Sequence, residues 1–104
     1  MKVEDKYLEI FVNKIREKCG QNLKRVLLFG SRARGDSEAA SDYDLLLIFD
    51  EVGPEIKAFI SDLEGEMLYQ YNSLFCAFPL TEADLKRKRF QPFIMNAQKE
   101  GIPL

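Results

Sequence analysis

The sequence predicts an α/β (α+β) fold, with a small mixed β-sheet and helices packed mainly on one face. Three apolar runs, at 24–29, 43–49 and 73–80, have the length and continuity of buried strands, and the third is expected to end at Pro79. Segments with helical spacing precede the first run and separate the second from the third. Strands separated by helices are typical of a sheet covered by those helices. Because 104 residues supply one modest core, we expect a single domain over 1–104.

The helices are predicted from apolar spacing and from the residues that begin and end them. Segment 5–19 follows the 3.6-residue period of an amphipathic helix, and Gly20 ends it. Segment 55–71 returns to the same spacing. A short helix is expected over 81–90, which begins with a threonine cap, and another begins near Pro92. The apolar stripe of the first helix consists of Leu8, Phe11, Val12, Ile15 and Cys19.

Composition and charge exclude several classes of function. With 17 acidic and 15 basic residues, the net charge of −2 gives no electrostatic reason for direct nucleic-acid binding. No apolar run approaches the roughly 20 residues of a membrane span, and the N-terminus lacks signal character, so we expect a cytoplasmic protein without membrane association. Histidine is absent, which removes Ser-His and Cys-His catalysis and the commonest zinc ligand. Chemistry must then rest on carboxylates, hydroxyls, Lys/Arg and a hard metal ion.

The segment LLFGSRARGDSEAASDYDLLLIFD, residues 27–50, breaks one apolar run at Gly30-Ser31 and opens the next with two aspartates. Glycine lets the backbone approach a ligand closely, and the first amides of a helical turn can receive phosphate oxygens. The Ser31 hydroxyl adds one more donor. The same pair also fits an ordinary turn, and the segment is neither a Walker A loop nor a G-x-G-x-x-G motif.

Asp42 and Asp44 are two residues apart where the next strand begins, so their carboxylates share one face and Tyr43 points to the other. Two carboxylates this close repel each other, and a divalent cation relieves the repulsion. Oxygen ligands at this spacing suit Mg²⁺ or Mn²⁺, which complete their coordination with substrate phosphates. Alone, the pair also fits a solvated strand end. Together with the turn at Gly30, it provides the layout needed to hold a metal–nucleoside triphosphate.

The stretch GSRARGDSEAASDYDLLL resembles the G-S-x-x-x-G…S-D-x-D-L signature of the polymerase-beta-like nucleotidyltransferase superfamily. The short chain, with a following helix-strand-helix and no second domain, is similar to the minimal nucleotidyltransferase (MNT) branch. The resemblance implies a palm-like nucleotidyltransferase fold in which Gly30 and Ser31 hold the triphosphate. By the same resemblance, Asp42 and Asp44 are the catalytic and metal-binding residues. Ser41 occupies the family's usual serine position beside the nucleotide, with a capping role.

The resemblance also implies an activity and a partner. The reaction is transfer of a nucleoside monophosphate, in the first place AMP, from ATP or another NTP to a hydroxyl, with Mg²⁺ or Mn²⁺ as cofactor. Minimal members work beside a separate helical HEPN protein in toxin–antitoxin pairs, and some add AMP to a tyrosine of that partner. A HEPN-type partner is therefore expected, while the base, the acceptor and homo-oligomer formation stay open.

One element of the family pattern is absent. Active members use a third carboxylate on the next core strand, but the corresponding segment here, SLFCAF, contains no acid. Glu66 on the preceding helix is a weak substitute, and Glu82 and Asp84 are better explained by a helix cap. Without the third acid, the ion beside the attacking nucleophile would be held poorly. The alternative is therefore a catalytically weak or inactive nucleotide-binding antitoxin that acts by contact.

Several other side chains receive simpler interpretations. Arg32 and Arg34 point in different directions if their turn is helical, so Arg32 is assigned to the phosphates and Arg34 to the surface. The KRKR run at 86–89 is interpreted as the solvated end of a helix and not as an RNA contact. Cys19 and Cys76 belong to no C-x-x-C pair and are interpreted as buried, reduced thiols. The phenylalanines assigned to the core are Phe49, Phe59, Phe75, Phe78, Phe90 and Phe93.

Overall fold

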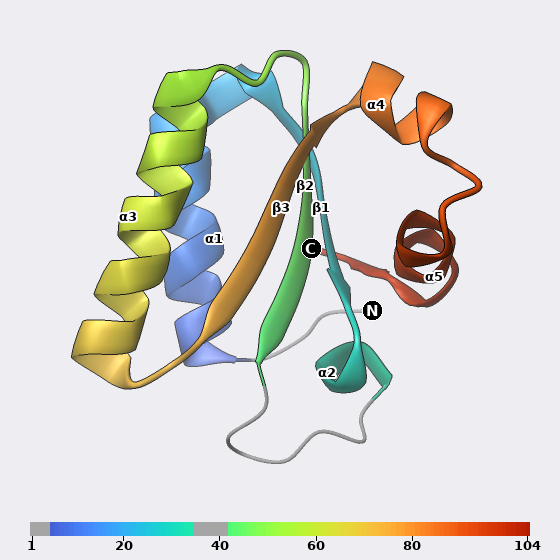
Figure 1. Cartoon of the computed structure of the whole chain (residues 1–104). Helices are drawn as coiled ribbons and strands as arrows, with labels where there is room; N and C mark the ends of the chain where they lie inside the picture. Colours follow the sequence, from blue (N-terminus) through green and yellow to red (C-terminus); the bar gives the residue numbers. More distant parts are fainter. Residues whose placement is uncertain (1–4, 35–41) are drawn as a thin grey trace.

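A computed structural model describes residues 5–34 and 42–104 and contains a four-stranded sheet of order β3-β2-β1-β4 (Figure 1). The antiparallel pair at its centre joins β1 (Leu23–Phe29) to β2 (Tyr43–Phe49). Strand β3 (Phe75–Thr81) runs parallel to β2, and the short β4 (Ile102–Pro103) runs antiparallel to β1. The sheet is therefore mixed, as expected.

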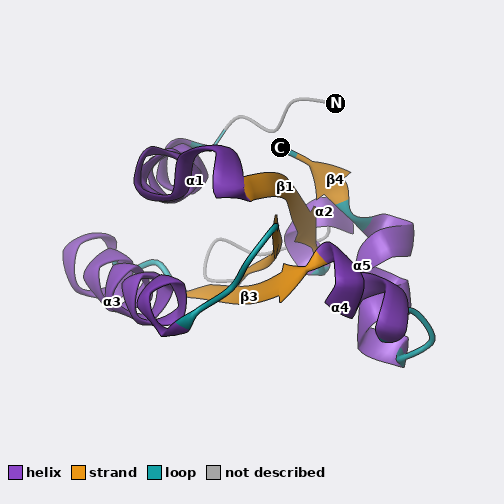
Figure 2. Ribbon diagram, turned by 90° about the horizontal axis from the view of Figure 1, so that it is seen from above, coloured by secondary structure: helices purple, strands orange, loops and turns teal. Residues whose placement is uncertain are grey.

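Helices cover both faces of this sheet, with the two long ones on the same side (Figures 1 and 2). Helices α1 (Lys6–Cys19) and α3 (Pro54–Tyr71) lie side by side there, and the 3-10 turn η1 (Gly20–Asn22) follows α1. The shorter α4 (Glu82–Arg87) and α5 (Pro92–Glu100) cover part of the other face. The one-turn helix α2 (Ser31–Arg34) follows β1. The helices thus lie mainly, though not entirely, on one face.

Strand β2 divides the core into two layers because its side chains alternate between the faces. Leu45, Leu47 and Phe49 pack towards α1 and α3, while Leu46 and Ile48 pack towards α4 and α5. All five are fully buried. The continuously apolar sequence of this strand is explained by helices on both of its faces.

The C-terminal segment contains a strand that sequence spacing did not predict. In β4, Pro103 pairs with Leu27 and Ile102 with Leu28, and the Leu104 amide donates to the Val26 carbonyl oxygen at 2.9 Å. A two-residue strand carries no period of its own, so only its tertiary pairing reveals it.

Two expectations about individual residues are wrong. Pro79 does not end the third strand but lies within β3, opposite Leu47, because proline is tolerated on an edge strand that lacks a neighbour on one side. Of the phenylalanines assigned to the core, Phe78, Phe90 and Phe93 are exposed on the α4–α5 side. Their apolar character alone could not separate a core position from a surface one.

The structure places both cysteines nearer the surface than the sequence predicted. Cys19 and Cys76 are free and half-buried, so they are reduced thiols that are less deeply placed than predicted. None of the helices within the described ranges is long and apolar enough to cross a bilayer.

Candidate active site

Asp42 immediately precedes β2, and Asp44 is its second residue, on the face opposite the Tyr43 side chain. Tyr43 is 4% exposed and belongs to the core layer under α1 and α3. Asp42 is exposed and Asp44 is half-buried. Both carboxylates are near Cys76, whose pKa their negative charges help to raise. The predicted separation from Tyr43 is found for Asp44, whose register partner Phe29 lies in the second core layer, whereas Asp42 and Tyr43 line the same cavity.

Gly30 brings the end of β1 against the carboxylate of Asp44. The residue has φ +78°, a conformation that glycine adopts easily, and a methyl group built on it would overlap the Asp44 carboxylate. The antiparallel register places Phe29 directly opposite Asp44, which brings the two chain segments together. The turn at Gly30 and the carboxylate of Asp44, which are fourteen residues apart in sequence, thus lie side by side.

The predicted helical turn after Gly30 is present as α2, which Ser31 begins. The Ala33 amide donates to the Gly30 carbonyl oxygen at 3.1 Å. The Ser31 side chain and the whole of Ser41 lie outside the described part of the chain, so their expected contacts with nucleotide stay predictions.

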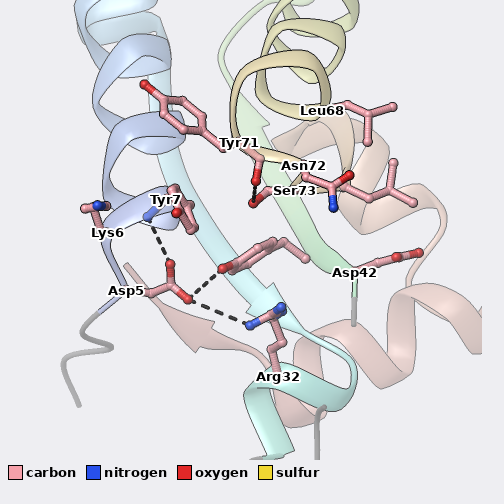
Figure 3. A pocket seen from close by; sticks show the side chains of 11 residues that line it. Asp5, Lys6, Tyr7, Arg32, Asp42, Leu68, Tyr71, Asn72 and Ser73 are labelled. Carbon is pink, nitrogen blue, oxygen red and sulfur yellow. Dashed lines mark hydrogen bonds and ion pairs between the residues drawn. The ribbon is translucent and has the colours of Figure 1, made fainter. Parts of the chain in front are cut away.

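Arg32 points from α2 towards the N-terminus of α1 (Figure 3). Its guanidinium carbon lies 3.8 Å from the centre of the Tyr43 ring, and Nη1 lies 3.8 Å from Oδ2 of Asp5. The Tyr43 hydroxyl donates a hydrogen bond to the same Asp5 oxygen at 2.7 Å. Burial, with this hydrogen bond, raises the pKa of Tyr43, so its hydroxyl stays protonated. We call these three residues the Asp5–Tyr43–Arg32 cluster.

Asp5 is a residue that the sequence reasoning missed as part of the site. Its Oδ1 accepts hydrogen bonds from the amides of Tyr7 and Leu8 at 3.0 and 3.1 Å, which makes it the N-cap of α1. An aspartate just before an amphipathic segment is a recognisable cap, but its second bond, to Tyr43, depends on a contact 38 residues away.

A cavity of about 810 Å³ lies beside the cluster and extends to Asp42 (Figure 3). Its remaining walls come from the start of α1 and the end of α3, including Tyr7 and Tyr71, whose ring centres are 5.2 Å apart. The volume lies in the range of small-molecule sites, roughly 300–1,000 Å³.

Comparison with known proteins identifies the family. The family model "Polymerase beta, Nucleotidyltransferase" matches residues 13–104. The chain belongs to this nucleotidyltransferase family. "Putative protein adenylyltransferase MJ0604" of Methanocaldococcus jannaschii is 33% identical over 98 residues, which cover 94% of each protein.

Solved structures of other proteins share the fold of this chain. The crystal structure of "a putative nucleotidyltransferase from Sulfolobus solfataricus" matches with TM-score 0.60 and 22% identity, covering 94% of this chain and 76% of that one. A toxin–antitoxin crystal structure with AMP-PNP matches with TM-score 0.61 and 18% identity, covering 91% and 70%. The chain thus has the nucleotidyltransferase fold as well as the family's sequence, and it is similar to a putative protein adenylyltransferase.

In this nucleotidyltransferase, Cys76 stands next to the acid pair on β3. It is the register partner of Asp44, and burial, followed by the charges of Asp42 and Asp44, raises the pKa of its thiol. The thiol is therefore neutral at physiological pH. Within residues 5–34 and 42–104, no group of three or more carboxylate, thiol or imidazole side chains could hold a metal ion.

The other acids considered for the third position are engaged elsewhere. Glu66 pairs with Lys14 at 3.0 Å between α1 and α3. Asp84 forms a capping box with Thr81, and Glu82 contacts Arg25 at 3.1 Å. These contacts support the interpretation of Glu82 and Asp84 as residues of a helix start.

The acid pair fits one divalent cation better than two. Its two carboxylates offer the hard oxygen ligands of Mg²⁺ or Mn²⁺, and the close approach of Gly30 keeps side-chain bulk away from Asp44. Cys76 adds no hard ligand. The two carboxylates would hold one ion, with substrate phosphates and water completing its coordination.

Proposed function

We propose that the chain transfers AMP from ATP to a hydroxyl of a helical HEPN-type partner protein, in a Mg²⁺-dependent reaction, as the antitoxin of a toxin–antitoxin pair. Its membership of the nucleotidyltransferase family supports the reaction class. The name of its M. jannaschii relative supports AMP and a protein acceptor, and the toxin–antitoxin neighbour supports a partner. Free thiols and the use of ATP agree with a cytoplasmic location.

The contact between Gly30 and Asp44 is the single observation that carries this proposal. It joins the turn that would receive phosphate oxygens to the carboxylates that would hold the cation. A nucleoside triphosphate bound to a cation needs both kinds of group within one site.

Each residue then has a defined role. The backbone at Gly30 and Ser31 would bind the triphosphate, with Ser41 beside it. Asp42 and Asp44 would hold a Mg²⁺ ion, which supplies positive charge to the phosphates when bound. Arg32 lines the cavity that extends to Asp42, and its contact with Tyr43 would hold the turn in position.

The transfer forms one bond and breaks another. The acceptor oxygen attacks the α-phosphorus of ATP, its proton passes to solvent or a nearby base, and the bond to pyrophosphate breaks. The acceptor hydroxyl must reach the open side of the acid pair, where Asp42 is exposed.

Incubation with α-labelled ATP, Mg²⁺ and the purified partner tests the proposal. We expect label on the partner with the wild-type chain and loss of nearly all label with Asp42→Asn. The matched control is Asp62→Asn, which changes an exposed acid on α3. Equal labelling by wild type and Asp42→Asn would show that the site is wrong.

The second candidate function is an antitoxin that acts by contact and keeps a nucleotide pocket of little catalytic power. The neutral Cys76 beside Asp44 favours it, because the acid pair then lacks a third ligand. Calorimetry with Mg²⁺–ATP, run beside the transfer assay, separates the two. Binding of ATP without product, with the partner present, would favour the contact-only antitoxin.

A further inference from the structure

We propose that the cavity beside the Asp5–Tyr43–Arg32 cluster holds the base and ribose of the nucleotide, and that the side-chain amide of Asn72 bonds to the edge of the base. This inference rests on the proposed function and names where its ATP substrate is held beyond the phosphates. The cavity has a volume of about 810 Å³ and reaches from Arg32 to the end of α3 (Figure 3). Cavities of this size hold small molecules.

One end of the cavity belongs to the candidate site of the triphosphate and the cation. Arg32 directly follows Ser31 in α2, and Asp42 is one of the two acids. Both Arg32 and Asp42 line the cavity. Because the nucleoside is bonded to the α-phosphate, it must lie in space that is continuous with the phosphate site. The cavity supplies such space between α2, the start of α1 and the end of α3.

The wall at the end of α3 carries apolar side chains that the fold leaves uncovered. Leu68 and Leu74 line the cavity and are 48% and 43% exposed. The Tyr43 amide donates to the Leu74 carbonyl oxygen at 2.9 Å, which fixes Leu74 beside the start of β2 and the acid that precedes it. A base is flat and has apolar faces, so placing it against these side chains removes apolar surface from water.

Asn72 supplies a polar group that can recognise a base. It ends α3 with φ 51° and ψ 37°, a left-handed conformation that glycine would adopt at lower cost. Its side chain lines the cavity and forms no hydrogen bond to any residue of 5–34 or 42–104. A carboxamide presents a donor and an acceptor side by side, which matches neighbouring polar atoms on the edge of a base, such as N6 and N7 of adenine.

The polar groups of this wall favour the nucleoside over the acceptor side chain as the occupant. A tyrosine or serine of a partner carries one polar group, the reacting hydroxyl, which must lie at the α-phosphorus. The Asn72 amide would then be covered without a hydrogen-bond partner, at a cost in affinity. Ser73 donates its hydroxyl to the Tyr71 carbonyl oxygen at 3.2 Å, so its oxygen can accept from a base amino group or a ribose hydroxyl.

Calorimetry with Mg²⁺–ATP and with Mg²⁺–tripolyphosphate, which has the phosphates without the nucleoside, tests this assignment. We expect ATP to bind the wild-type chain more tightly than tripolyphosphate does. Asn72→Asp keeps the size and tolerates the left-handed backbone but removes the amide donor, so ATP affinity should fall about tenfold relative to tripolyphosphate. Leu74→Ser should lower the same ratio about fivefold, because apolar contact is lost. The ratio cancels the effect of the added aspartate charge on the phosphates.

The matched controls lie on α5 and do not line the cavity. Asn96→Asp makes the same change at an exposed position, and Met95→Ser changes a side chain that is 50% exposed. Both controls should leave the ratio of the ATP and tripolyphosphate affinities unchanged. Thermal unfolding confirms that each variant folds.

The outcomes separate this inference from the proposed function. Wild-type binding of ATP that is no tighter than that of tripolyphosphate overturns the inference and leaves the phosphate site standing. A ratio that is unchanged in both cavity variants, or that falls equally in the α5 controls, also overturns it. Unchanged ATP binding with loss of AMP transfer in the cavity variants would assign the cavity to the acceptor and overturn it as well. Failure of AMP transfer by the wild type, with the expected affinities, counts against the proposed function alone.

Discussion

Gly30 and Asp44 lie in direct contact, and a side chain at position 30 would occupy the space of the Asp44 carboxylate. This contact joins the end of β1 to the start of β2 and places a conformation available to glycine beside the candidate cation site.

Gly30→Ala should therefore abolish nucleotide binding as well as lower stability. The added methyl displaces Asp44, and the positive φ adds strain on the order of 1 kcal/mol or more. Calorimetry with Mn²⁺–ATP and urea unfolding measure the two effects. Gly20→Ala is the matched control, since Gly20 has φ +56° with open space around it. If both variants bind ATP like the wild type, the contact has no role in binding.

Cys76→Asp should give the site a second cation. The new carboxylate would stand beside Asp44 in the parallel register and supply the hard ligand that the thiol lacks. We expect electron paramagnetic resonance titration to show two bound Mn²⁺ per chain instead of one, and AMP transfer to become faster. Cys76→Asn, of the same shape without the charge, should stay at one. A stoichiometry of one in Cys76→Asp would refute this assignment.

The Asp5–Tyr43–Arg32 cluster should stabilise the start of α1. Asp5→Ala removes the N-cap and the acceptor for Tyr43, so we expect a loss of about 1–2 kcal/mol in the free energy of unfolding. Asp5→Asn keeps a capping oxygen and should cost less. Urea unfolding measures both, and Tyr43→Phe combined with Asp5→Ala tests their coupling. Independent, additive losses would mean that the hydrogen bond contributes little.

Glu64 should make the free energy of unfolding decrease as the pH rises above the ordinary pKa of a glutamate. Burial raises the pKa of this carboxyl, although the Ala77 amide, which donates to it at 2.9 Å, opposes the shift. Between the ordinary and the raised pKa, the folded state binds more protons than the unfolded state, so the free energy of unfolding decreases with pH. Glu64→Gln keeps the acceptor oxygen and should remove this decrease in urea unfolding between pH 4 and 7. Asp62→Asn on the same helix is the control, and a pH profile of Glu64→Gln that matches the wild type would contradict the prediction.

Most of the fold could be predicted from local patterns. The apolar stripe of α1, the continuous run of β2 and the threonine cap before α4 are signals within a few residues, and each element was found close to its expected bounds. Strand β4 and the position of Pro79 within β3 could not be predicted, because both depend on which strand lies at a sheet edge.

The sequence by itself determined the site's chemistry: no histidine, a Gly-Ser turn and two aspartates spaced for one face of a strand. Only the tertiary structure decided that Gly30 contacts Asp44, that Arg32 lies over Tyr43, and that the neutral Cys76 is the neighbour of the acid pair. Period and composition act over a few residues, whereas these contacts arise from the register between strands, which is set by packing of the whole sheet.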